Sequence, residues 1–264
     1  TFPLKRKKKL STYWKIVREL RKENGELGVI FVNTFISALL FRLGNVKKNI
    51  GYNREGRGFL LDFSPEINYH KHYINRYAFL FNEYIGNKYV YLPELSLRYT
   101  GQKTFQFDNS HKTIALYLGG ENKEFRKYPD EYAVQLLRLL NRQGYNLLLI
   151  GDENDNIKHT QYAEEARIDH LINLTARTTI EGFINTIANV DLIITIDSSA
   201  LHIAAAVKTP FIALMGLSTS PTSTILPKVP LGRILKIENN LIREEDYIRN
   251  ITPDLILKTI SELI

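Results

Sequence analysis

"DLIITIDSSALHIAAAVKTPFIALMG", residues 191–216, decides the fold of this chain. An apolar run (191–197) ends in an acid, an alanine-rich helical stretch (201–207) follows, and a second apolar run (210–216) ends in glycine. Apolar runs without polar alternation are typical of parallel strands that are covered on both faces. The stretch therefore predicts a strand–helix–strand unit with parallel strands.

The same alternation precedes this stretch. Three further apolar runs have the length of buried strands: 113–118, 145–151 and 170–175. Helical patterns lie between the runs, at 130–144, 156–167 and 179–188. Asp130 after Pro129 is expected to cap the first of these helices, and Gly144 to end it. Strands that alternate with helices in this way predict a doubly wound α/β domain.

The first hundred residues are less regular but have the same character. Helices are expected at 11–25, 34–44 and 70–86, and short strands at 28–33 and 47–53. The pattern is that of the later part of another α/β unit, with its beginning missing. With 92–109 as a linker, we divide the chain into residues 1–105, 106–250 and a last helix in 251–264.

Charge is unevenly distributed along the chain. Residues 1–105 hold 19 Lys and Arg against 8 Asp and Glu, a net charge of +11, whereas the remainder holds 16 against 20, a net charge of −4. This asymmetry suggests an anionic partner for the first part, such as a phosphorylated lipid, a membrane surface or nucleic acid. For "KRKKK" (residues 5–9) alone, a solvated basic face without a specific partner is an equally good interpretation.

Composition excludes several classes of function. The chain has no cysteine, which rules out disulfides and thiolate chemistry and suits a reducing cytoplasm. No apolar run is long enough to span a membrane. The sequence contains no P-loop, no G-x-G-x-x-G fingerprint, no G-x-S-x-G elbow and no strong metal-ligand spacing. No known nucleic-acid motif is present either.

Polar residues follow three of the predicted strands, at the edge where doubly wound sheets bind ligands. The first strand ends in "GGENKEFRKYP" (119–129), which offers close backbone approach and two cations, Arg126 and Lys127. The second is followed by Asp152, Glu153 and Asp155, which can accept hydrogen bonds from ribose hydroxyls. Taken singly, a Gly-Gly turn with nearby cations is common, and Asp155 is equally well explained as a helix cap.

The third strand end carries Asp197, followed by Ser198 and Ser199 at the start of a helix and His202 one turn later. The amides and hydroxyls at a helix start favour an anion, and the helix dipole reinforces the preference. Each residue also has a structural explanation, because serine is a common helix cap and a lone histidine is more often structural than a ligand contact.

The order and spacing of these segments along the chain resemble those of a known family. The elements "GGENKEFRKYP", "LLLIGDENDN", "DSSALHIAAA" and "TPFIALMG" resemble the donor domain of glycosyltransferase family 9, the lipopolysaccharide heptosyltransferases. The first part, with "VNTFISALLFRLGNVKKNIGYNREGRGFLL" and "HYINRYAFL", is similar to the acceptor-side domain of that family. It is nearest to the heptosyltransferase II branch, and "ITPDLILKTISELI" is similar to that branch's last helix.

The resemblance implies a GT-B architecture, with two facing Rossmann-like α/β domains of which the first is incomplete here. It also implies inverting, metal-independent transfer of heptose from ADP-heptose to the inner core of lipopolysaccharide. ADP-sugar would be a substrate, and no cofactor is expected. The acceptor would be a phosphorylated lipid A core, which explains the basic first part without nucleic acid. The protein would be cytoplasmic, with peripheral contact to the anionic inner membrane.

Roles carried over by position fall on the three strand ends. Arg126, a lysine in many relatives, would hold the pyrophosphate or sugar, and Asp197 would bind sugar hydroxyls. The amides of Ser198, Ser199 and Ala200 would bind the phosphates, and His202 would support that turn or contact a phosphate. The remaining donor-site residues implied by the resemblance are Gly119, Gly120, Glu121, Lys127, Asp155 at the ribose, and Ala176 and Thr178 at the adenine.

Two departures from the family pattern stand out. Ser199 occupies a position where the family usually has glycine. The family's first strand and its loop, which carry the aspartate thought to act as general base, have no counterpart, so we expect that base upstream of Thr1 and the chain to be a piece of a longer protein. Two alternatives stay open: transfer or epimerisation of another nucleotide sugar, and a non-catalytic module that binds donor or nucleic acid.

Overall fold

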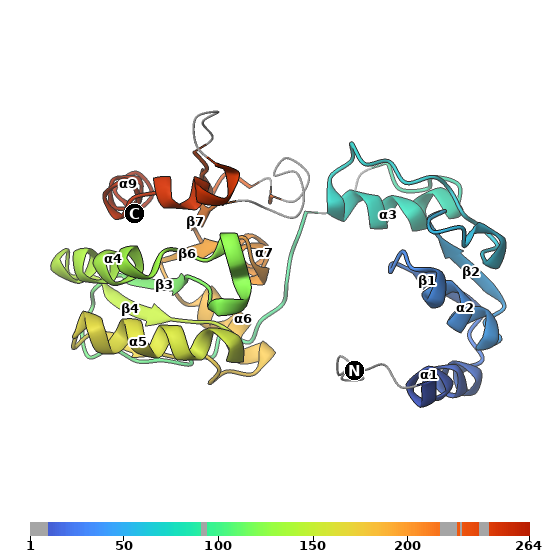
Figure 1. The fold of residues 1–264 in the computed structure, drawn as a ribbon, viewed down its shortest axis with the longest axis horizontal. Helices are drawn as coiled ribbons and strands as arrows, with labels where there is room; N and C mark the ends of the chain where they lie inside the picture. The colour runs from blue at the N-terminus through green and yellow to red at the C-terminus, as the bar shows by residue number, and fades with distance from the viewer. Residues whose placement is uncertain (1–9, 91–93, 217–225, 228, 238–242) are drawn as a thin grey trace. The chain divides into compact units, whose positions relative to one another are not determined.

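The computed structural model describes residues 10–90, 94–216, 226–227, 229–237 and 243–264. The basic run at 5–9 lies outside this described part. The chain divides between Pro93 and Glu94 into two compact units, which are coloured blue to teal and green to red in Figure 1.

The first unit is a small α/β structure. Its described elements are α1 (Leu10–Glu23), β1 (Leu27–Ile30), α2 (Phe35–Leu43), β2 (Lys48–Gly51), the 3-10 turn η1 (Gly58–Leu60) and α3 (Tyr73–Tyr84). β1 and β2 pair in parallel, from Leu27 opposite Lys48 to Ile30 opposite Gly51, with α2 as the crossover between them. Ile30, Ile50 and Leu80 are buried between these elements.

The side chain of a buried arginine forms hydrogen bonds with the backbone of the turn that follows β1. The guanidinium of Arg57 is fully buried and donates hydrogen bonds to the carbonyl oxygens of Val32, Thr34 (3.2 Å) and Tyr52 (3.0 Å). Burial lowers the pKa of Arg57, but an arginine keeps its charge even so. The geometry of the turn at the carboxyl end of β1 therefore depends on this side chain.

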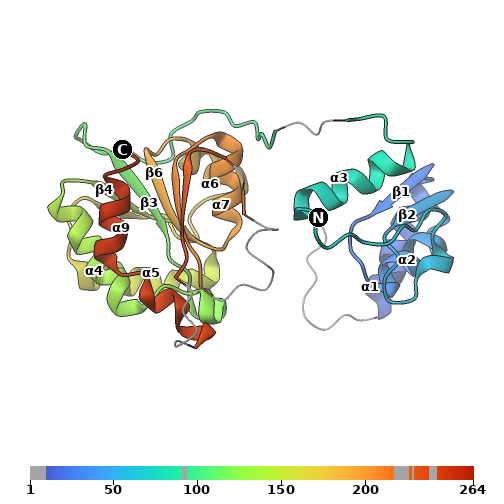
Figure 2. The same ribbon diagram turned by 90° about the horizontal axis from the view of Figure 1, so that it is seen from above.

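The second unit is a doubly wound α/β domain. Its described elements are β3 (Thr113–Tyr117), η2 (Glu121–Arg126), α4 (Asp130–Arg142), β4 (Asn146–Leu149), η3 (Glu153–Asp155), α5 (Asn156–Ala166), β5 (Leu171–Asn173), α6 (Ile180–Ala188), β6 (Leu192–Ile196), α7 (Ser199–Val207), β7 (Phe211–Leu214), β8 (Gly232–Leu235), η4 (Glu244–Asn250) and α9 (Pro253–Ile260). All strand pairs are parallel, and the order is β5-β4-β3-β6-β7-β8. Figure 2 shows α4, α5 and α9 on one face of this sheet and α6 and α7 on the other.

The strands in the middle of the sheet confirm the interpretation of the apolar runs. Every residue of β3, β4, β6 and β7 is buried. β8 was not predicted from the sequence, because its residues are partly exposed and show no apolar run. A short polar strand at a sheet edge has no periodic signal of its own, and only its pairing with β7 defines it.

Asp130 does not cap α4 with its side chain, contrary to the sequence prediction, since the cap position belongs to Pro129. Its carboxylate instead accepts hydrogen bonds from Tyr162 (2.5 Å) and Lys158 (3.1 Å) of α5 and pairs with Lys127 (2.7 Å). Burial by itself would raise the pKa of Asp130, but these contacts outweigh it and lower the pKa to about 2. The carboxylate therefore joins α4 to α5.

The second unit begins earlier than residue 106, where the sequence was divided. The amide of Leu97 donates to the carbonyl of Ala206 (3.2 Å), and the amide of Thr100 to the side chain of Asn185 (3.1 Å). These bonds attach part of the expected linker to α6 and α7. Among the described helices, none has both the length and the apolar character needed to cross a membrane.

Candidate functional site

The strand order places the topological switch point of the sheet at the carboxyl ends of β3 and β6. From β3 the chain crosses to β4 on one side, and from β6 it crosses to β7 on the other. At such a switch point the two connections leave in opposite directions, and a ligand can enter between them. The two strands end within one residue of each other, since Tyr117, the last residue of β3, lies opposite Thr195 of β6.

The residues predicted for the donor site follow four adjacent strands at this one edge. Those after β3 and β6 flank the switch point, Asp155 follows β4, and Ala176 and Thr178 follow β5. Within the chain they span more than eighty positions, from 119 to 202. The topology therefore gathers them along the same side of one sheet.

Two glycines allow the loop after β3 to lie close to its neighbours. Gly119 has φ of +81°, and a Cβ there would lie 2.7 Å from the side chain of Ile196 in β6. A Cβ at Gly120 would lie 2.4 Å from the backbone oxygen of Asn154 in η3. At these two positions, therefore, the loop fits between the ends of β4 and β6 only as glycine. Glu121 begins η2, and its side chain is outside the described part.

Replacing Gly120 with alanine is expected to destabilise the second unit by about 1–3 kcal/mol, because backbone atoms must shift to accept the new methyl group. Nucleotide affinity should fall with it, since the displaced loop borders the switch point. Chemical unfolding and calorimetry with ADP measure the two effects. Gly182→Ala is the control, because its new Cβ would meet the nearest atom at 3.4 Å, an ordinary contact. Equal stability of the two variants would contradict this role for Gly120.

The end of β6 forms a capped helix start. The hydroxyl of Ser198 accepts a hydrogen bond from the amide of Ala200 (3.2 Å) and lies 3.0 Å from the hydroxyl of Thr195. The capping role considered for Ser198 is therefore present, and a phosphate would compete with it for the Ala200 amide. Asp197 is half-buried beside this cap, and Ser199 is exposed.

Two adjacent cations, Arg126 and Lys127, act on different surroundings. The charge of Arg126 acts on the hydroxyl of Tyr117 at the end of β3, where it opposes burial and the nearby acids, which together raise the pKa of Tyr117. Lys127 instead pairs with Asp130 (2.7 Å). Of the two, Arg126 is therefore the one whose charge acts on the end of β3.

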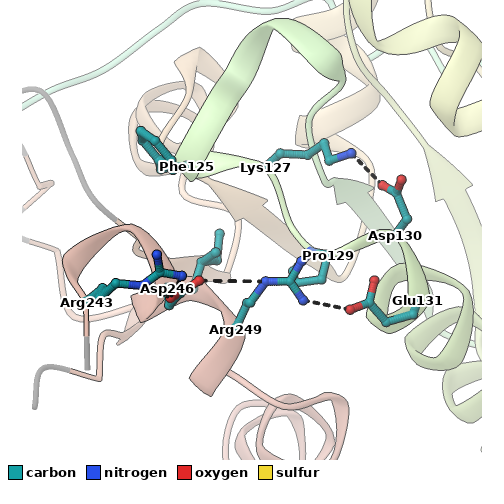
Figure 3. Close-up of a pocket in the computed structure, with 9 residues that line it drawn as sticks. Phe125, Lys127, Pro129, Asp130, Glu131, Arg243, Asp246 and Arg249 are labelled. Carbon is teal, nitrogen blue, oxygen red and sulfur yellow. Dashed lines mark hydrogen bonds and ion pairs between the residues drawn. The ribbon is translucent and has the colours of Figure 1, made fainter. Parts of the chain in front are cut away.

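Lys127 lines a pocket of about 370 Å³ beside the start of α4, shown in Figure 3. Its charged lining residues are three cations and three acids: Lys127, Arg243, Arg249, Asp130, Glu131 and Asp246. They pair with one another, with Arg249 2.8 Å from Glu131 and Arg243 2.7 Å from Asp246. Because these charges cancel, the pocket by itself lacks the excess positive charge that a diphosphate requires.

The loop after β4 exposes Asp152 and Glu153 and buries Asp155, the acid that the resemblance assigns to the ribose. Asp155 is fully buried, and its Oδ2 accepts a hydrogen bond from the amide of Asp152 (2.9 Å), which closes the η3 turn. Asp152 itself is exposed and pairs with Lys123 (3.2 Å). A ribose contact by Asp155 would need this turn to open, and that contact stays a prediction.

Lys123 also lies at this strand end, although it was not predicted as a site residue from the sequence. Its ammonium lies 5.6 Å from the centre of the Tyr117 ring, and its side chain is 19% exposed. Lys123 lies three residues after the Gly-Gly turn, and this spacing by itself does not indicate a binding residue. The side chain reaches the Tyr117 ring of β3 only once η2 has formed.

The remaining predicted residues also follow strands at the carboxyl edge of the sheet. Ala176 has a left-handed backbone (φ +60°), and its amide donates to the carbonyl of Gly151 (3.1 Å), which joins the loops after β5 and β4. Thr178 and His202 are half-buried. Among the described residues, no group of three or more His, Cys, Asp or Glu is arranged to hold a metal ion.

Comparison with known proteins gives a family match over most of the chain. Residues 13–245 match the model of glycosyltransferase family 9 (heptosyltransferase). The lipooligosaccharide heptosyltransferase 2 of Haemophilus influenzae is 26% identical over 281 aligned residues, which cover 97% of this chain and 81% of that protein.

Two solved structures have the same fold. E. coli ADP-heptose lps heptosyltransferase II superposes with a TM-score of 0.81 at 21% identity, covering 96% of this chain and 81% of that one. E. coli heptosyltransferase WaaC with ADP-2-deoxy-2-fluoro heptose superposes with a TM-score of 0.73 at 16% identity, covering 96% of this chain and 76% of that one. These likenesses confirm the predicted α/β, GT-B class of fold with parallel sheets.

Proposed function

Because the chain belongs to glycosyltransferase family 9 (heptosyltransferase), we propose that it transfers a heptose from ADP-heptose to the inner core of lipopolysaccharide. The transfer is inverting and uses no metal ion. The observation that carries the proposal is the convergence of a glycine-lined loop, a cation and a capped helix start at the switch point between β3 and β6.

The donor's diphosphate lies between the loop after β3 and the start of α7. Gly119 and Gly120 let backbone amides approach it closely, and Arg126 neutralises its charge. The positive end of the α7 dipole, with the amides of Ser198 and Ser199, stabilises the ADP that leaves. Lys123 supplies a second cation at the same edge.

The sugar and the nucleoside lie on either side of this diphosphate. Asp197 accepts hydrogen bonds from heptose hydroxyls and orients the anomeric carbon toward the acceptor. On the other side, the adenine lies against the loop at 176–178, and the ribose faces the loop after β4. Among the acids of that loop, Asp152 and Glu153 are exposed and can accept hydrogen bonds from ribose hydroxyls, whereas Asp155 is buried.

The acceptor is a phosphorylated lipid A core, to which the basic first unit is complementary in charge. Such an acceptor is anchored in the cytoplasmic face of the inner membrane, and the protein acts there. The WaaC structure contains an ADP-2-deoxy-2-fluoro heptose, which supports ADP-heptose as the donor class for this related chain.

Calorimetry with ADP and with UDP tests the donor. We expect ADP to bind more tightly, and Arg126→Ala to weaken ADP binding by about 10- to 100-fold, the value of one hydrogen bond to a charged group. Arg142→Ala is the matched control, because Arg142 ends α4 at its far end. Preference for UDP would overturn the ADP-heptose assignment and favour another nucleotide-sugar transferase or an epimerase.

A further inference from the structure

A polar cluster is buried where helix α5 begins. Asp155 and His159 lie one turn apart at the start of this helix, and both side chains are fully buried. Residues four apart on a helix lie on the same face, so the two side chains share one side of α5. On that side, Nδ1 of His159 lies 2.8 Å from the hydroxyl of Thr175, which is itself buried just after β5.

Two atoms of this cluster have no hydrogen-bond partner among the described residues: Oδ1 of Asp155 and Nε2 of His159. Folded proteins leave few buried polar atoms unpaired, because each one is costly. The two atoms are complementary. With Nδ1 accepting from the Thr175 hydroxyl, the neutral imidazole carries its proton on Nε2 and is a donor there, while the carboxylate oxygen is an acceptor.

Electrostatics place the carboxylate of Asp155 near this imidazole. Burial lowers the pKa of His159, and the negative charge of Asp155 opposes that effect. The imidazole is therefore neutral at pH 7. Burial and the charge of Asp155 also raise the pKa of Tyr117, so the carboxylate lies between the end of β3 and the imidazole.

Asp155 in turn fixes η3, the turn that exposes the acids of the loop after β4. Its Oδ2 accepts a hydrogen bond from the amide of Asp152 (2.9 Å), and the Asp152 carboxylate accepts one from the amide of Asn154 (2.8 Å). The turn is closely packed, since a Cβ at Gly151 would lie 2.8 Å from Oδ2 of Asp155. The orientation of Asp152 therefore depends on where the Asp155 carboxylate is held.

We propose that His159 is a positioning residue for the ribose of the donor: it holds the Asp155 carboxylate, and with it the turn that carries Asp152. One buried water molecule, which accepts from Nε2 of His159 and donates to Oδ1 of Asp155, completes the link, as ordered waters do between buried polar atoms. Thr175 fixes the tautomer from the other side of the ring. The inference rests on the proposed function, which brings a ribose to the exposed acids of η3.

Hydrogen exchange tests this link without any ligand. The amide of Asp152 donates to Asp155, so its protection, measured by NMR, reports on the closed turn. His159→Leu keeps a side chain of similar size without polar atoms and should lower this protection about 10-fold, the value of one buried hydrogen bond. His159→Gln should keep most of it, because an amide side chain can accept from Thr175 and donate toward Asp155. Unchanged protection in His159→Leu would overturn the proposal.

Calorimetry with ADP and with 2′,3′-dideoxy-ADP, which lacks both ribose hydroxyls, tests the effect on the ribose. We expect the wild-type chain to prefer ADP by about 10- to 100-fold, the value of a hydrogen bond to a charged group. His159→Leu should reduce this preference about 10-fold by weakening ADP binding, and His159→Gln should retain it. A histidine that only fills space would instead leave the preference unchanged, and that result would overturn the proposal.

Tyr162→Phe is the matched control. Tyr162 is buried on the same helix, but its hydroxyl donates to Asp130 of α4 and not to η3. Its loss should lower stability in chemical unfolding without changing the preference for ADP or the protection of the Asp152 amide. If His159→Leu does not fold, Thr175→Val, which removes only the hydroxyl partner of Nδ1, is held to the same expectations.

The outcomes separate this inference from the proposed function. A wild-type chain that binds no ADP would overturn the proposed donor and the ribose role together, while hydrogen exchange would still test the link between His159 and η3. A wild-type chain that binds ADP and 2′,3′-dideoxy-ADP equally would overturn the ribose role alone. Equal losses of both ligands in His159→Leu would do the same.

Discussion

Replacing Asp197 with alanine is expected to lower the rate of heptose transfer by about 10²–10³-fold, the loss seen when one preorganised charge-stabilising group is removed from an active site. The variant should still bind ADP, because the proposed diphosphate contacts lie on the β3 loop and at the start of α7. ADP-heptose should lose the extra affinity that its sugar provides over ADP. Transfer assays and calorimetry with the two ligands measure these effects.

Asp191→Asn is the matched control for this prediction. Asp191 precedes β6 at the amino end of the same strand, where its carboxylate accepts a hydrogen bond from the amide of Thr113 (2.8 Å). It should therefore affect folding more than transfer. If Asp197→Ala transferred heptose at the wild-type rate, or discriminated ADP-heptose from ADP as before, the assignment of Asp197 to the sugar would be wrong.

Replacing Arg57 with lysine is expected to destabilise the first unit by about 3 kcal/mol or more, although the charge is kept. Each hydrogen bond from a charged group contributes about 1.5–3 kcal/mol, and a single ammonium cannot reach every acceptor of the planar guanidinium. Besides three carbonyls, these acceptors are the side chains of Asn33 (2.9 Å) and Ser37 (3.0 Å). Buried and part-buried acceptors left without a donor account for the loss.

The unfolding of the first unit can be followed separately from that of the second. Trp14 is the chain's single tryptophan and lies in α1 of the first unit, so its fluorescence reports on that unit during urea denaturation. Arg54→Lys is the control, because Arg54 is exposed, and its effect should stay within about 0.5 kcal/mol. Equal stability of the Arg57 and Arg54 variants would show that the buried hydrogen bonds do not hold the turn.

The helices and central strands of the second unit were predictable because each carries a local signal. Every residue of Thr113–Tyr117 and Leu192–Ile196 is buried, and all are apolar except the threonines 113 and 195, as expected of strands covered on both faces. β8 was not predictable, since an edge strand with partly exposed residues is defined by its neighbour. The part played by Asp130 was also missed, because its partner Tyr162 is thirty-two residues away.

By itself the sequence determined the alternation of strands and helices, the class of fold, the family, and the strand ends at which polar residues gather. These features depend on periodicity and on residues near one another in the chain, so local patterns carry them. Tertiary structure alone decided which of those residues are buried and which are paired across the fold. It buried Asp155, paired Asp152 with Lys123, and enclosed Arg57. These outcomes depend on neighbours that are distant in sequence, and folding is what brings them together.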